Sequence, residues 1–137
     1  NMNSIFTDII NGSIIGHFIY EDENHIAILD KYPIDFGHSL LIPKKQYEKI
    51  TDMPLNEIGD LFSKIPKIVN AILDATGADA FSLAQNNGKA AKQIVPHVHI
   101  HIIPRYSSKE TIWTKRGIPS NDDLEKLAKK IKDSIEN

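Results

Sequence analysis

The stretch PHVHIHIIPR, residues 96–105, alternates histidine with β-branched residues over a short distance. β-branched side chains favour a strand, and successive side chains of a strand point to opposite faces of a sheet. A strand over 95–103 therefore places His97, His99 and His101 on one face and the aliphatic side chains on the other. Since residues two apart along a strand are separated by roughly 6.5–7 Å, the three imidazoles form a row about 13 Å long.

Four further strands are predicted upstream of this one. Runs rich in β-branched and aromatic residues, bounded by polar or proline-containing turns, occupy 17–20, 25–30, 39–43 and 80–85. The first two runs flank a polar cluster and predict a hairpin. With a long helix crossing from the third strand to the fourth, these runs predict an α+β fold built on an antiparallel meander sheet of about five strands.

Three helices are predicted around this sheet. Apolar residues at helical spacing predict a short helix over 4–11 and a long one over 52–77. We expect Asp52 to cap the long helix, Gly77 to follow its end and Pro66 to kink or break it. Ser120 begins a capping-box-like S-x-x-D before a closing amphipathic helix.

Composition and charge predict one ordinary globular domain. The 137 residues are 41% hydrophobic and 25% charged, which suffices for one domain over 4–137, with 106–137 as a C-terminal arm and helix. The formal net charge of −2 gives no bias toward nucleic acid. No apolar run approaches the roughly 20 residues that span a bilayer. We expect a cytoplasmic protein with neither a nucleic-acid nor a membrane partner.

The residues alone leave four interpretations of the histidine row open. It could be the polar outer face of a half-buried strand, a metal site, a pH sensor or a catalytic site. The row fits a zinc site poorly, because a third histidine at i+4 would have to bend far to join the other two as a ligand and the chain has no cysteine. In chemistry at phosphorus, one imidazole would attack while its neighbours donate to phosphate oxygens and to the leaving group.

Residues 97–103, HVHIHII, match the histidine-triad motif His-φ-His-φ-His-φ-φ at every position. Other stretches follow in the order and spacing of the same family: IFTDII (5–10), AILD (27–30), GHSLLIPKK (37–45) and QNNGKAAKQ (85–93). Over about residues 4–106, the sequence thus resembles the histidine-triad superfamily, and its Hint branch most closely. The resemblance implies the HIT-like fold and a site for a purine nucleotide.

The resemblance also implies the roles of the histidines. His99 would attack the α-phosphorus, expel the leaving group and form a covalent nucleotidyl-imidazole intermediate, which water then hydrolyses. His101 would donate a hydrogen bond to the phosphate or the leaving group, with His97 and His38 in a supporting network. No metal or other cofactor is required, because imidazoles and backbone N–H groups can carry the phosphate charge.

The implied nucleotide-binding residues come from several segments. Asp30 would accept hydrogen bonds from both ribose hydroxyls, Asn86 would contact the ribose or phosphate, and Gln93 with the backbone of Ile94 would approach the α-phosphate. The apolar slot for the base would be formed by Ile5, Phe6, Ile9 and Ile28. Turn chemistry is an alternative explanation for Asp30 and Asn86, and core packing for part of the slot.

The sequence departs from the family pattern at two places. Relatives that bind structural zinc carry two cysteines and a histidine where this chain has Ser4, Thr7 and Gln46, so that zinc site is expected to be missing. Ile94 stands where many relatives have serine or threonine, so a hydroxyl that could assist the leaving group is absent.

Taken with the resemblance, these residues predict a nucleotide-binding hydrolase that cleaves at the α-phosphorus of purine nucleoside phosphoramidates, similar to an adenosine 5'-monophosphoramidase. A dinucleoside polyphosphate hydrolase and a nucleotide-binding regulatory protein with incidental turnover are the alternatives. The resemblance further implies a homodimer, with Trp113 of the arm reaching toward the partner's site.

Overall fold

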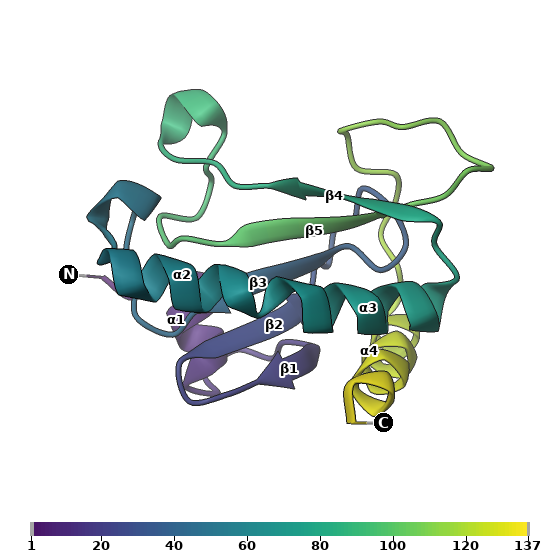
Figure 1. Cartoon of the computed structure of the whole chain (residues 1–137), viewed down its shortest axis with the longest axis horizontal. Coiled ribbons are helices and arrows are strands. Elements are labelled where there is room, and N and C mark those ends of the chain that lie inside the picture. Colours follow the sequence, from purple (N-terminus) through teal and green to yellow (C-terminus); the bar gives the residue numbers. More distant parts are fainter. Residues whose placement is uncertain (1, 137) are drawn as a thin grey trace.

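A five-stranded antiparallel sheet forms the centre of the computed structural model, which describes residues 2–136 (Figure 1). Helices flank the sheet. The connections also contain two short 3-10 helices, at Ile50–Asp52 and Lys89–Ala91. In chain order, the main elements are α1 (Ile5–Ile10), β1 (Phe18–Glu21), β2 (His25–Leu29), β3 (Ser39–Pro43), α2 (Leu55–Ser63), α3 (Ile65–Thr76), β4 (Ala80–Ala84), β5 (Ile100–Arg105) and α4 (Asn121–Glu136).

The spatial order of the strands is β1-β2-β3-β5-β4. The predicted antiparallel sheet is confirmed, and its first three strands follow one another as a meander. After α2 and α3 the chain returns to the far edge as β4, and β5 then fills the place between β3 and β4. As a result, His101 pairs with Leu40 of β3 on one side and with Ala84 of β4 on the other. The histidine motif therefore enters the interior of the sheet.

The strand that carries the motif begins later than predicted, at Ile100 instead of residue 95. Pairing between β3 and β5 extends only to Leu41 and Ile100. Before Ile100, two hydrogen bonds hold the chain. The backbone N–H of Val98 donates to the backbone oxygen of Tyr47, and the imidazole of His97 bonds to the backbone oxygen of Pro43. The predicted alternation of faces nevertheless holds. Val98 and Ile100 are buried in the core beneath α2 and α3, while the rings of His97 and His99 contact Phe6 of α1 and the ring of His101 lies beside that of His99.

Apolar side chains are buried on both faces of the sheet. The larger core lies between one face and helices α2, α3 and α4, which Figure 1 shows crossing and flanking the sheet. A smaller cluster on the opposite face packs Phe6 and Ile9 of α1 against β2 and β3. This smaller cluster adjoins the histidine motif.

The predicted long helix is two helices, which meet at Lys64. Pro66 lies in the first turn of α3, where its missing N–H leaves no helical hydrogen bond unmade. The prediction that Asp52 caps the long helix was wrong, because Pro54 occupies the N-cap of α2. Asp52 instead ends a 3-10 helix, and its carboxylate accepts the N–H of Lys49 at 3.1 Å. Gly77 ends α3 with a φ of 73°, as expected.

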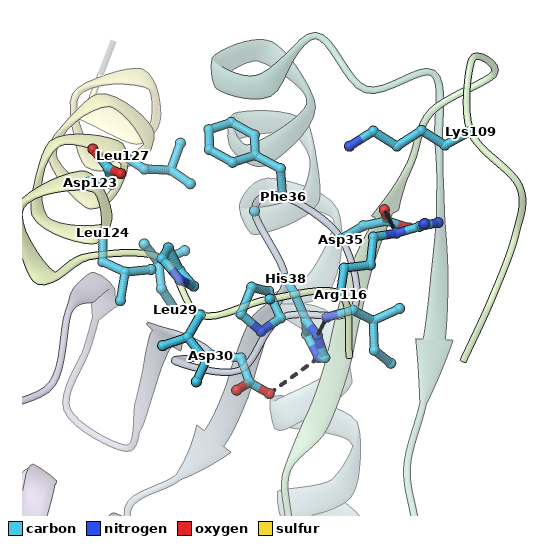
Figure 2. A pocket seen from close by; sticks show the side chains of 16 residues that line it. Leu29, Asp30, Asp35, Phe36, His38, Lys109, Arg116, Asp123, Leu124 and Leu127 are labelled. Atoms are coloured by element: carbon cyan, nitrogen blue, oxygen red, sulfur yellow. Dashed lines mark hydrogen bonds and ion pairs between the residues drawn. The ribbon is translucent and has the colours of Figure 1, made fainter. Parts of the chain in front are cut away.

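The segment 106–119 leads from β5 to α4 without forming a helix or strand. Arg116 fastens it to the β2–β3 loop through the carboxylate of Asp35, and Figure 2 shows these two side chains beside one another. The ring of Trp113 lies 4.7 Å from the guanidinium of Arg105 in the same chain. Ser120 accepts the N–H of Asp123 at 3.1 Å, which confirms the predicted start of the closing helix. Within the described residues, no helix has the length and apolar character needed to cross a membrane.

Candidate active site

Most of the predicted site residues line one cavity of about 330 Å³. The cavity lies against α1, the end of β2 and the chain leading into β5. Its lining combines the apolar side chains predicted to hold the base with the carboxylate of Asp30 and the imidazoles of three histidines, His17, His99 and His101. The predicted residues on its wall are Ile5, Phe6, Ile9, Ile28, Asp30, Ile94, His99 and His101. This arrangement suits a ligand with a flat apolar ring at one end and polar groups at the other.

His99 is buried, and its Nδ1 lies 2.7 Å from the backbone oxygen of His97. A carbonyl oxygen only accepts hydrogen bonds, so Nδ1 carries the proton of the neutral ring and Nε2 keeps a lone pair. Burial lowers the pKa of His99 below its usual value, and the charge of His101 lowers it further, while the bond to His97 and the charge of Asp30 act in the opposite direction. His99 is therefore neutral, with an unprotonated Nε2.

His38 determines which nitrogen of His101 carries a proton. Nδ1 of His38 accepts the backbone N–H of Ile34 at 3.0 Å, and its Nε2 lies 3.0 Å from Nδ1 of His101. Burial, followed by the charge of His101, lowers the pKa of His38 to about 3, so the ring is neutral and its single proton is on Nε2. His38 therefore donates to Nδ1 of His101, which leaves Nε2–H of His101 as a donor.

The rings of His99 and His101 are neighbours. The ring centroids of His99 and His101 are 5.0 Å apart, and burial lowers the pKa of His101 as well. A neutral imidazole with an available lone pair thus stands beside a neutral imidazole with an available N–H. Attack on an electrophile by one ring, with a hydrogen bond from the other ring to the electrophile or its leaving group, is the chemistry that this pair can perform.

Asp30 stands at the junction of two cavities. One carboxylate oxygen accepts the N–H of Tyr32 at 2.8 Å, and the other lies 3.5 Å from Nε2 of His38, as Figure 2 shows. Burial raises the pKa of the Asp30 carboxyl, while the bond from Tyr32 and the charge of Lys115 oppose that effect. The second cavity, of about 300 Å³, lies beyond Asp30 and His38, beneath the arm and α4.

Two predicted nucleotide ligands, Asn86 and Gln93, do not line the larger cavity. Gln93 is buried and closes the 86–93 loop, because its amide oxygen accepts the N–H of Gly88 and its amide nitrogen donates to the backbone of Glu48, both at 2.6 Å. The neighbouring Asn87 accepts the N–H of Ile50 at 2.8 Å. Gln93 therefore holds the loop in place, and direct contact of Asn86 or Gln93 with a nucleotide stays a prediction.

Two lysines on the cavity wall, Lys31 and Lys115, were not predicted from the sequence. Lys31 and Tyr32 directly follow Asp30, so their proximity to the site could have been inferred. Lys115 comes from the arm, where no periodic pattern indicates its position. Its ammonium lies 4.9 Å from the centre of the Tyr32 ring. With Lys92, these lysines make the polar end of the cavity cationic on a chain of net charge −2.

The positions that bind zinc in some relatives do not fit this metal here. Ser4, Thr7 and Gln46 do come together, but the Gln46 amide oxygen accepts the backbone N–H of Ser4 at 2.7 Å and the hydroxyl of Thr7 at 2.9 Å. Structural zinc is bound by thiolates and imidazoles. A hydrogen-bonded cluster therefore stands at these positions.

A second group close enough to share a metal is formed by Asp30, His38 and His101, whose ligand atoms lie within 4.8 Å of one another. Both nitrogens of His38 are already engaged, one by the N–H of Ile34 and the other as a donor to His101. A metal at Nε2 of His38 would require loss of that proton and of the bond to His101. The hydrogen-bond pattern therefore favours a proton relay at this group.

Comparison with known proteins agrees with this geometry. A family model described as the HIT domain matches residues 11–108. Adenylylsulfatase HINT3 of Arabidopsis thaliana is 42% identical over 114 residues, covering 83% of this chain and 57% of that protein. Adenosine 5'-monophosphoramidase hnt1 of Schizosaccharomyces pombe is 31% identical over 137 residues, covering 98% of this chain and 99% of that protein. The crystal structure of the histidine triad nucleotide-binding protein ST2152 from Sulfolobus tokodaii superposes with a TM-score of 0.90 at 37% identity, covering 97% of this chain and 92% of that one. With its complete triad in the matching fold, this chain belongs to the HIT domain family.

Proposed function

We propose that the protein hydrolyses purine nucleoside phosphoramidates at the α-phosphorus, through a covalent nucleotidyl intermediate on His99. The observation that carries the proposal is the pair of neighbouring imidazoles, with a lone pair on His99 and an N–H on His101, at the polar end of a cavity with an apolar slot. The similarity to a monophosphoramidase over nearly the whole chain supports the same reaction.

The hydrogen bonds around the two imidazoles support a two-step reaction. Nε2 of His99 forms a bond to phosphorus while the bond from phosphorus to the amine nitrogen breaks and the departing amine takes up a proton from solvent. Nε2–H of His101 donates a hydrogen bond to the phosphate or the leaving group. The carbonyl of His97, which accepts Nδ1–H of His99, stabilises the positive charge that develops on the attacking ring. Water then attacks phosphorus, the bond from phosphorus to Nε2 of His99 breaks, and the proton that the water loses passes to solvent.

The lysines of the cavity favour a second candidate, hydrolysis of nucleotides with an anionic leaving group. Lys92 and Lys115 lie on the same wall as His99 and His101, and the similar HINT3 is an adenylylsulfatase. An anionic leaving group needs less help from a proton donor than an amine does, so the absence of a hydroxyl at Ile94 matters less for it. Dinucleoside polyphosphates and adenylyl sulfate are substrates of this class.

A substrate panel distinguishes these candidates. We expect the highest kcat/KM for an adenosine phosphoramidate, when it is compared with adenylyl sulfate and a dinucleoside polyphosphate under identical conditions. A higher kcat/KM for either anionic substrate would replace the first candidate by the second. Tight binding of AMP without turnover of any of the three would instead indicate a regulatory nucleotide-binding protein.

The pKa shifts of the buried histidines predict the pH dependence of turnover. The pKa of His99 is lowered from about 6.5, so kcat/KM should be constant above pH 6.5 and decrease in more acidic solution as His99 becomes protonated and loses its lone pair. These histidines bind protons more readily in the unfolded chain, so the free energy of unfolding should also decrease below pH 6.5. A pH–rate profile, corrected for the fraction of unfolded protein, measures the decrease in kcat/KM. An acid limb with an apparent pKa above 6.5 would contradict it.

We also propose that the protein is a homodimer that associates through β4. This strand is hydrogen-bonded only on the β5 side of the sheet, and its Phe81 and Leu83 are 42% and 43% exposed. Exposed apolar side chains on a free strand edge favour association. Sedimentation equilibrium should give twice the 15.4 kDa chain mass, and Phe81→Asp should shift the mass toward that of one chain. A single-chain mass for the unchanged protein at micromolar concentration would contradict this proposal.

A further inference from the structure

His97 does not line the cavity, yet both nitrogens of its ring are held. Nε2 lies 2.7 Å from the backbone oxygen of Pro43, and Nδ1 lies 2.6 Å from the hydroxyl oxygen of Ser4. The carbonyl of Pro43 can only accept, so Nε2 carries the proton and Nδ1 accepts the hydroxyl hydrogen of Ser4. Both side chains are buried, and water does not compete for these bonds.

The hydroxyl hydrogen of Ser4 is available for His97. The other close bonds of Ser4 use its oxygen as an acceptor, from the N–H of Thr7 at 3.0 Å, or its backbone N–H as a donor, to Gln46 at 2.7 Å. The hydroxyl of Thr7 is 3.3 Å from Ser4 and donates to Gln46 at 2.9 Å. Ser4 therefore joins the N-terminus of α1, which it caps, to the ring of His97.

Two paths lead from this bond to His99. The backbone oxygen of His97 accepts Nδ1–H of His99 at 2.7 Å, so any shift of residue 97 moves the group that fixes the protonated nitrogen of His99. Phe6, two residues after Ser4 in α1, packs edge-on against both rings, with centroid distances of 5.7 Å to His97 and 4.9 Å to His99. Displacement of either the helix or the His97 ring would change the orientation of His99.

We infer that Ser4 is a positioning residue for the reaction: its hydroxyl fixes the place of the His97 ring, whose tautomer the Pro43 carbonyl sets, and, through the His97 carbonyl, the orientation of His99. This inference rests on the proposed role of His99 as nucleophile. It assigns a role to the hydrogen-bonded cluster of Ser4, Thr7 and Gln46, at the positions where the family resemblance implies zinc ligands in some relatives. In this chain a buried hydroxyl, in place of a metal, organises the back of the site.

The test compares Ser4→Ala with three other variants of the full chain. Ser4→Ala removes the donor to His97, and Ser4→Thr restores it. Ser4→Asp keeps an acceptor that caps α1 but cannot donate to Nδ1 of His97. Thr7→Val is the matched control, because it removes a hydroxyl of the same cluster that donates to Gln46 and not to His97. The readouts are kcat and KM for an adenosine phosphoramidate, and the nitrogen-15 shifts that report the tautomers of the imidazoles.

We expect Ser4→Ala and Ser4→Asp to lower kcat roughly tenfold, the effect of losing about one buried hydrogen bond in the transition state, with KM changed less than about twofold. Ser4→Thr and Thr7→Val should stay within about threefold of the unchanged chain. His97 should keep its proton on Nε2, opposite the Pro43 carbonyl, in every variant. The nitrogen-15 shift of its Nδ1 should change in Ser4→Ala and Ser4→Asp and be restored in Ser4→Thr, because that nitrogen loses or regains its hydrogen bond.

Several results would overturn the inference. One is a kcat for Ser4→Ala that equals that of Thr7→Val, whatever their stabilities. Another is full activity of Ser4→Asp, which would mean that capping of α1 is the only role of Ser4. If the unchanged chain turned over no nucleotide, the proposed function would fail. The nitrogen-15 shifts of His97 and His99 would then decide the inference alone, and unaltered shifts of Nδ1 of His97 and of the His99 ring in Ser4→Ala would reject it.

Discussion

Replacing His99 by alanine should reduce kcat for an adenosine phosphoramidate by at least about 10³-fold, because no nitrogen remains to form the nucleotidyl intermediate. AMP binding should change only a few-fold, since Asp30 and the apolar slot are untouched. Steady-state kinetics and calorimetric titration with AMP measure the two effects separately. Because His99 is buried, the fold of His99→Ala should be checked by circular dichroism and an unfolding curve.

His17→Ala is the matched control for this variant. His17 lines the same cavity from the segment before β1, so the two variants remove the same side chain from different walls. We expect His17→Ala to retain turnover within about threefold. Equal losses of kcat in His99→Ala and His17→Ala, or substantial turnover by His99→Ala, would contradict the role of His99 as nucleophile.

Replacing Asp35 by asparagine should lower the free energy of unfolding by about 3–5 kcal/mol, the usual effect of breaking a buried ion pair. Asp35 is buried in the β2–β3 loop, and its two carboxylate oxygens accept from Arg105 at 3.1 Å and from Arg116 at 2.7 Å. Without the carboxylate, the buried guanidinium of Arg105 loses its neutralising charge. Urea unfolding measures the loss.

Glu21→Gln is the control for Asp35→Asn. Glu21 pairs with Lys44 at 2.9 Å, but its side chain is half exposed, so loss of its charge should change stability by no more than about 1 kcal/mol. The arm should be affected only in Asp35→Asn, because Arg116 ties it to Asp35. Similar losses of stability in both variants would contradict the assignment of Asp35 as the buried centre of this network.

Features set by local physics were predictable from the sequence. The bounds of β3, the end of α3 at Gly77 and the start of α4 after Ser120 agree with the structure. Each depends on residues adjacent in the chain, such as a β-branched run, a glycine with positive φ or a hydroxyl cap. The histidine face was predictable for the same reason, since alternation needs only one extended segment.

Features set by distant residues were not predictable in the same way. The late start of β5 depends on where pairing with β3 ends, which no residue near His97 indicates. Asp35 meets partners 70 and 81 residues away, and Lys115 reaches the cavity only because the arm is tied down there. The hydrogen bond between Ser4 and His97 joins positions 93 residues apart.

The central claim is that hydrolysis proceeds in two displacements, with His99 bonded to phosphorus between them. Its most direct test is the stereochemical course at phosphorus, measured with an adenosine phosphorothioamidate of known configuration in oxygen-18 water. Each in-line displacement inverts the configuration, so two displacements predict net retention in the phosphorothioate product. Net inversion would mean a single direct attack by water and would contradict the nucleotidyl-histidine intermediate.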